Sequence, residues 1–136
     1  MPNRSDVIIT AREWIGTPFH HQACVKQVGT DCAQLIAGVG AELGLMPMLP
    51  PELCAYGRVP KPDRMRTIIE MFLDPVIGDP QPGDILYMGW KVGRPMHMAF
   101  LTDLHGRGIL HAFSDAGKVV ETALPESYER MTDSWS

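Results

Sequence analysis

Cysteine is scarce in this sequence, and nothing in the spacing pairs one cysteine with another. The 136 residues contain three, Cys24, Cys32 and Cys54, without a CxxC pair. An odd number at irregular spacing argues against a disulfide framework, and the lack of a CxxC pair disfavours a closed zinc site. We therefore expect at least one free thiol and ask which one is reactive.

The sequence also lacks a basic stripe, a long apolar run and a signal peptide. Its formal net charge is −4, which disfavours nucleic acid as a partner. No apolar run is long enough to span a bilayer, so no membrane partner is expected. The first residues, MPNRSDVIITAREW, do not combine a basic start with an apolar block as signal peptides do. The protein is expected to stay in the cytoplasm or to leave by a route other than general secretion.

The length fits one domain, 1–136, whose core needs neither disulfides nor metal. The first half has helical periodicity. In SDVIITAREWIG the apolar residues follow one helix face: Val7, Ile8, Ala11, Trp14 and Ile15. Ser5 or Asn3 can cap this helix, and Gly16 with Pro18 ends it.

A second helix is predicted from about Asp31 to Leu43, after a loop at 17–30. Its apolar stripe consists of Leu35, Ile36, Val39 and Leu43. Gly38 and Gly40 lower its helix propensity, which is tolerable if the backbone packs closely against a flat neighbour. Five prolines make residues 46–62 an irregular connection, and PDRMRTIIEMFLD fits a third helix.

The second half consists of short runs bounded by Gly, Pro and Asp, which are typical of strands. The runs are DILYMGW, HMAFLTD, GILHAFSD and KVVETAL. Short turn-like segments join the last three, so an antiparallel meander is predicted. Helices followed by strands indicate an α+β domain, with N-terminal helices packed on a C-terminal antiparallel β-sheet.

Cys32 occupies an unusual place, at the start of the second predicted helix in QVGTDCAQLIAGVG. The first turn of a helix presents unpaired N–H groups and the positive end of the macrodipole. A thiolate is stabilised there, so the pKa of Cys32 is expected to fall, and Asp31 can cap the same helix. The alternative is a small buried apolar residue near a helix start.

A nucleophilic cysteine needs a base and a group that orients the base. His97 and His111 lie in consecutive predicted strands, and they share one face whenever the numbers of paired residues have an even sum. If the hairpin closes near Leu104 they lie directly opposite each other, and if it closes near His105 they are diagonal neighbours within reach. Two histidines without a joint role are the alternative. The same face would carry Ala99, Leu101 and Phe113, and packing the helix stripe of Cys32 on it would bring the thiol towards His97.

His20 and His21, in the loop before Cys32, could suggest a metal site together with Cys24. No i, i+4 pair of histidines or nearby carboxylate completes a ligand set, so neither metal nor cofactor is expected. Loop residues before a nucleophile more often line a substrate pocket.

Several segments, in the right order, resemble the NlpC-type family of cell-wall cysteine peptidases. AREWIGTPFHHQACVKQVGTDCAQLI resembles its nucleophile segment, PQPGDILYM its Pro-Gly-Asp strand opening, HMAFLTD its catalytic histidine strand and ILHAF its His-Ala strand. The resemblance covers most of the chain. It implies a papain-like α+β fold with Cys32 as nucleophile, His97 as general base and His111 as orienting residue.

Family members cleave peptidoglycan stem peptides, typically between γ-D-glutamate and a diamino acid. GTPFHHQA and the compact layout are most similar to the branch in tail modules of phages and gene transfer agents. The resemblance therefore implies a virion-tail location, with tail-tip or baseplate hub proteins as partners. Phe19, His20, His21 and Asp31 are the residues expected at the substrate site.

The sequence departs from the family pattern at two places. Phe19 replaces a tyrosine, and Ala33-Gln34 replaces a Ser-Gly pair. Two other readings stay open: a catalytically silent structural or wall-binding component of a tail tip, and an amidase or acyl transferase on the same fold.

Overall fold

The computed structural model describes residues 2–46, 70–89, 96–124 and 132–135. The elements follow in the order α1 (Arg4–Arg12), β1 (Cys24–Val25), β2 (Gly29–Thr30), α2 (Cys32–Glu42), β3 (Ile85–Gly89), β4 (Met96–Thr102), a 3₁₀ turn (Leu104–Gly106), β5 (Gly108–Phe113), β6 (Lys118–Ala123) and β7 (Thr132–Trp135). The Pro-rich connection, Cys54 and most of the third predicted helix lie outside the described residues, although 70–72 are helical.

Five strands form one antiparallel sheet in the order β6-β5-β4-β3-β7. The predicted meander is confirmed. Strands β1 and β2, which pair as a separate ribbon, and β7 were not expected from the sequence. Two-residue strands carry no periodicity, and the run TDSW of β7 lacks the apolar alternation that identifies a strand.

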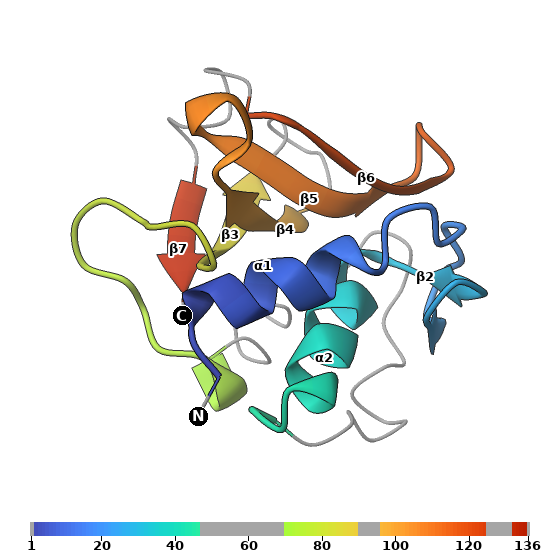
Figure 1. Cartoon of the computed structure of the whole chain (residues 1–136), viewed down its shortest axis with the longest axis horizontal. Coiled ribbons are helices and arrows are strands. Elements are labelled where there is room, and N and C mark those ends of the chain that lie inside the picture. The colour runs from blue at the N-terminus through green and yellow to red at the C-terminus, as the bar shows by residue number, and fades with distance from the viewer. Residues whose placement is uncertain (1, 47–69, 90–95, 125–131, 136) are drawn as a thin grey trace.

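Both helices pack on one face of the sheet, as Figure 1 shows. The main core joins them to alternate residues of β4 and β5: Met98, Phe100, Leu110 and Ala112. The opposite face has its own apolar cluster: Leu86, Ala99, Leu101 and Ile109. The prediction that the α2 stripe covers the face of Ala99 and Leu101 is therefore wrong. The larger apolar surface is on the other face, and covering it avoids placing the helix over two imidazoles.

Helix α1 begins with a capping box, in which Asn3 and Asp6 each accept the backbone N–H of the other. It ends four residues earlier than Gly16, because the chain tightens into a turn after Arg12. As a result Ile15 is 41% exposed and lies outside the buried face. Arg12 donates two hydrogen bonds of 2.9 Å to Glu121 of β6, which ties the end of the helix to the sheet.

Helix α2 has the predicted bounds within one residue, and its glycines are explained by close packing. A Cβ on Gly38 would lie 2.7 Å from Cη2 of Trp14 and 2.9 Å from Sγ of Cys24. A Cβ on Gly40 would meet only the flexible side chain of Met46. Gly38 therefore permits α2 to pack closely against Trp14, in the turn after α1, and against Cys24 of β1.

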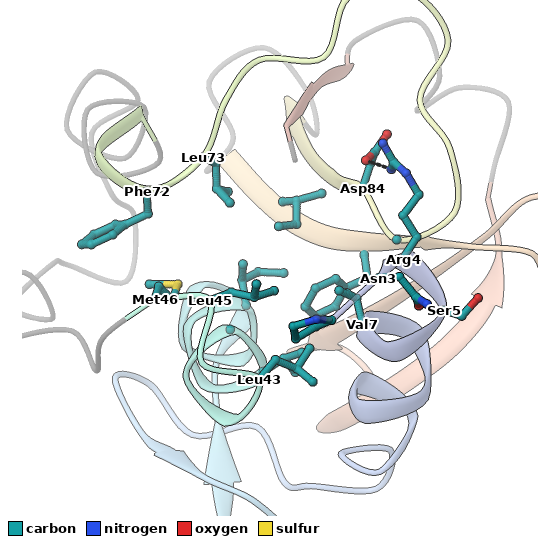
Figure 2. A pocket seen from close by; sticks show the side chains of 17 residues that line it. Asn3, Arg4, Ser5, Val7, Leu43, Leu45, Met46, Phe72, Leu73 and Asp84 are labelled. Atoms are coloured by element: carbon teal, nitrogen blue, oxygen red, sulfur yellow. Dashed lines mark hydrogen bonds and ion pairs between the residues drawn. The ribbon is translucent and has the colours of Figure 1, made fainter.

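Strand β3 begins next to a buried carboxylate, which explains the Pro-Gly-Asp segment. Asp84 is fully buried, accepts the Gln81 N–H at 2.8 Å and pairs with Arg4 of α1. Figure 2 shows this ion pair beside an apolar cavity of about 690 Å³. The cavity lies between the start of α1 and the C-terminal half of α2, so it is at the opposite end of α2 from Cys32.

Replacing the two glycines of α2 should have different effects on stability. Gly38→Ala should lower the free energy of unfolding by about 1–3 kcal/mol, because the new methyl group overpacks against an indole and a thiol. Gly40→Ala should be neutral or stabilising by up to about 1 kcal/mol, because alanine favours the helix and Met46 can move. Urea unfolding followed by circular dichroism measures both, and equal losses would contradict this account of Gly38.

Candidate active site

Asp31 fixes the start of α2 and hence the place of Cys32. Its carboxylate is 3% exposed and accepts the Gln34 N–H at 2.9 Å through Oδ1 and the Gln22 N–H at 2.7 Å through Oδ2. The first bond is the predicted N-cap. The second holds the preceding loop against the helix, so that Cys32 is the first residue of α2.

The segment before β1 connects the sheet to the strand that leads into Cys32. Phe19 donates its N–H to the Gly117 carbonyl at 2.8 Å, next to β6. On its other side, Thr30 donates to the Pro18 carbonyl at 3.0 Å and His20 donates to the Thr30 carbonyl at 2.9 Å. The Gly-Thr-Pro-Phe segment thus lies between β6 and β2 and positions the residues just before Cys32.

Strands β4 and β5 are not paired along their whole length. Their ladder ends at the pair Phe100 and Leu110. Leu101 donates its N–H to Asp84, on the β3 side. Because successive amides of a strand point to opposite neighbours, the N–H of Met98 points towards β5, beyond the end of the ladder. This amide is therefore available to another acceptor.

The half-buried Cys32 thiol lies at this point. The backbone N–H groups of Met98, Ala33 and Cys32 itself act on its sulfur in the direction that favours the thiolate. The beginning of α2 thus reaches the sheet where β4 and β5 separate. Met98 directly follows His97, so the thiol lies beside the strand position that carries the predicted base, although α2 covers the other face.

His97 and His111 form the predicted pair. Leu101 of β4 pairs with Ile109 of β5, so the hairpin is centred on His105. With this register the two histidines are diagonal neighbours. Nε2 of His97 lies 2.6 Å from Nδ1 of His111, and the rings meet edge to face with centroids 4.8 Å apart. The prediction that they share a face is confirmed. The bond to His111 thus engages Nε2 of His97.

Both imidazoles are held neutral by their surroundings. Burial, and secondarily the neighbouring His111, lowers the pKa of His97 to about 3. Burial lowers the pKa of His111 to about 4. Near pH 7 His97 is therefore in the form that can accept a proton, and the pair shares a neutral hydrogen bond.

The expectation that the helix start lowers the pKa of Cys32 is wrong for the free protein. Burial and, next, the negative charge of Asp31 raise the pKa of Cys32 to about 12. The surrounding N–H groups act in the expected direction but are outweighed. The resting site therefore holds a thiol and a neutral imidazole rather than an ion pair.

The residues expected at the substrate site lie in different environments. His21 lies beside the residue before Cys32, with its Nδ1 3.9 Å from Oδ2 of Asp31. His20 is exposed, and its Nδ1 is 3.3 Å from the His21 carbonyl. Phe19 is half-buried and packs against the main core. A substrate-binding role for these residues stays a prediction.

Cys24 is a half-buried thiol that donates to the Gln34 carbonyl at 3.3 Å, so it contacts α2 away from the histidines. Within the described ranges, no group of three or more His, Cys, Asp or Glu side chains could hold a metal ion.

Two groups near the histidines were not identified from the sequence. The Met98 amide becomes available only because a ladder ends, which no local pattern signals. Phe113 was placed on the histidine face but given no role; its ring stacks on His111 with centroids 5.0 Å apart and planes 15° apart. The i, i+2 spacing along β5 could have indicated this contact.

Stability should decrease as the pH falls below neutral. The unfolded chain binds protons on both histidines near pH 6.5, whereas the folded protein keeps them neutral down to about pH 3–4. The contribution of the two histidines to the free energy of unfolding is complete above pH 6.5. Below that pH it is lost at about 1.4 kcal/mol per pH unit for each histidine. Urea unfolding at pH 7, 6 and 5 should show this slope, with a flatter one in the variant His97→Gln/His111→Gln. The exposed His20→Gln is the control, and an equal flattening there would contradict the assignment.

Removing the charge of Asp31 should make Cys32 more reactive. Asn also caps helices, so Asp31→Asn keeps the helix start while removing a negative charge that raises the pKa of the thiol. Alkylation of Cys32 by iodoacetamide at pH 8, followed by peptide mass spectrometry, should be faster in the variant, with Cys24 as internal reference. An unchanged or slower reaction would show that Asp31 does not control the thiol electrostatically.

Comparison with known proteins identifies the fold. No family model and no curated protein matches the sequence. Among solved structures, the NlpC/p60 domain of the peptidoglycan hydrolase SagA matches with a TM-score of 0.56 and 18% identity over 90% of each chain. Two structures of an N-acetylmuramoyl-L-alanine amidase from Bacteroides uniformis match with TM-scores of 0.61 and 0.60 and 13% identity over 97% of each chain. The chain therefore has the expected α+β, papain-like NlpC-type fold.

Proposed function

We propose that this domain hydrolyses an amide bond in the peptide part of peptidoglycan, using Cys32, His97 and His111. The observation that carries the proposal is the 2.6 Å contact between Nε2 of His97 and Nδ1 of His111, on the strand whose next amide meets the Cys32 thiol. Nucleophile, base and orienting group in this relation are the requirements of covalent amide hydrolysis. The likeness to domains described as a peptidoglycan hydrolase and an amidase supports the substrate class.

The first step is acylation of Cys32. Neutral His97 takes the thiol proton as the sulfur attacks the carbonyl carbon, so charge separates only during the reaction. The backbone N–H of Cys32, at the beginning of α2, can donate to the developing oxyanion. The imidazolium then gives its proton to the leaving amine, and the C–N bond breaks to leave a thioester.

The second step is hydrolysis of the thioester. His97 takes a proton from water, the hydroxide attacks the same carbonyl, and the proton returns to the thiolate. His111 accepts the Nε2–H of His97 throughout. This hydrogen bond keeps the base in the tautomer whose Nδ1 is free, and it stabilises the imidazolium that forms.

The bond that we propose is the one between γ-D-glutamate and a diamino acid, as the sequence resemblance implies. His21, whose Nδ1 lies 3.9 Å from Oδ2 of Asp31, is a proposed contact for the stem peptide, together with Asp31, Phe19 and His20. A second candidate is the amide between N-acetylmuramic acid and L-alanine, which is favoured by the amidase among the solved structures of this fold.

The proposed setting is the tail tip of a phage-like particle, where assembly with tail-tip or baseplate hub proteins would deliver the domain to the wall. This proposal rests on the sequence resemblance of residues 16–23, GTPFHHQA. In the part of the chain that the structure describes, no helix is long and apolar enough to cross a bilayer.

The test is mass spectrometry of muropeptides incubated with purified protein and with Cys32→Ala. Wild-type protein should release stem-peptide fragments, and the variant should release none, because it lacks the thiol that is proposed to form the acyl intermediate. Circular dichroism of the variant controls for folding.

The masses distinguish the candidates. Fragments ending in D-glutamate identify the endopeptidase, whereas a free L-alanine amine identifies the amidase. Fragments from Cys32→Ala at the wild-type rate would refute the nucleophile. Intact muropeptides in both samples would favour a silent structural component over an isolated enzyme.

A further inference from the structure

Three rings form a cluster on the active-site face of the sheet. His111 stacks on Phe113, with centroids 5.0 Å and planes 15° apart, while its edge meets His97. Phe113 is also 6.4 Å from the His97 ring, tilted by 58°. The strand period places residues 111 and 113 on the same side of β5, so the stack follows from the backbone.

Phe113 does not belong to either apolar core. The main core joins the sheet to the helices and the second core lies around Leu101, and neither includes Phe113. Its partner on β6 is the exposed Lys118. This half-buried ring at the end of β5 is therefore in a position to act on the two histidines that it contacts.

Two features of the His111 ring must be fixed for it to bind His97: its flip and its tilt. Rotation about the bond between Cβ and the ring has broad minima, so an imidazole can tilt and can also flip. The hydrogen bond to His97 selects the flipped orientation in which Nδ1 is the acceptor, but a single bond leaves the tilt of the ring free. A flat aromatic neighbour at 15° fixes the plane.

We propose that Phe113 is a positioning residue of the catalytic triad, an inference that rests on the proposed function. Its ring keeps the plane of His111 aligned so that Nδ1 lies in line with the Nε2–H of His97. His97 is thereby kept in the tautomer that is protonated at Nε2, so that its unprotonated Nδ1 can take the thiol proton. Phe113 also shields the pair from water, which preserves the hydrogen bond between two neutral rings.

The experiment compares Phe113→Leu with Phe113→Tyr in the full-length protein. Leucine keeps apolar bulk but removes the flat ring, whereas tyrosine keeps the ring. Ile109→Val is the matched control, since Ile109 is buried on the same strand and face but belongs to the second core. Thermal unfolding of all three separates a loss of stability from a loss of positioning.

Two readouts are used. Long-range ¹H–¹⁵N correlation spectra report the tautomer of each imidazole, and kinetics on purified muropeptides give kcat and KM. In the wild type and in Phe113→Tyr, His97 and His111 should each show a single tautomer protonated at Nε2. In Phe113→Leu the His97 signals should report mixed tautomers, and kcat should fall about tenfold or more with KM little changed, since misalignment acts on the chemical step. Ile109→Val should keep both signals and kcat.

Three results would overturn the inference. The first is an unchanged tautomer pattern with unchanged kcat in Phe113→Leu. The second is an unchanged pattern with a raised KM, which would make Phe113 a substrate contact. The third is an equal disturbance in Ile109→Val, which would reduce the effect to stability. If wild-type protein cleaves no muropeptide, the proposed function fails, while the spectra still decide whether Phe113 orders the histidines.

Discussion

The arrangement of the candidate site depends on the carboxylate of Asp31. Its two oxygens accept one N–H from the first turn of α2 and one from the loop before it, so helix and loop are held by the same group. Because this carboxylate is buried next to Cys32, it also acts on the thiol electrically. One residue thus sets both the position and the resting protonation state of the nucleophile.

Two opposing effects, burial and nearby N–H groups, determine the protonation state of the site. Three backbone N–H groups surround the Cys32 sulfur and favour a thiolate, yet burial and the nearby negative charge favour the thiol. The same burial keeps His97 and His111 uncharged. A site of this kind stores no ion pair at rest. In the proposed reaction, charge would appear only when a bound carbonyl accepts the sulfur, with the oriented N–H groups already in place.

Local patterns in the sequence were sufficient for some features and insufficient for others. The strand period placed His97 and His111 on one face, and the cap at Asp31 located Cys32. The choice of face for α2 could not be made, because Met98 and Phe100 on one side and Ala99 and Leu101 on the other are all apolar. The sign of the thiol pKa shift depends on tertiary burial, which competes with the helix start and is not encoded near Cys32.

Gly38 has a consequence for how freely the nucleophile can move. The indole of Trp14 and the thiol of Cys24 both lie within the space that a side chain at Gly38 would fill. Turning α2 about its own axis would drive the flanking side chains of the helix into these two neighbours. These contacts therefore restrict rotation of α2 about its axis at a point half-way along the helix. Because the helix backbone is rigid, they also restrict its first residue. The direction in which Cys32 points is thus set partly by a contact more than one helical turn away.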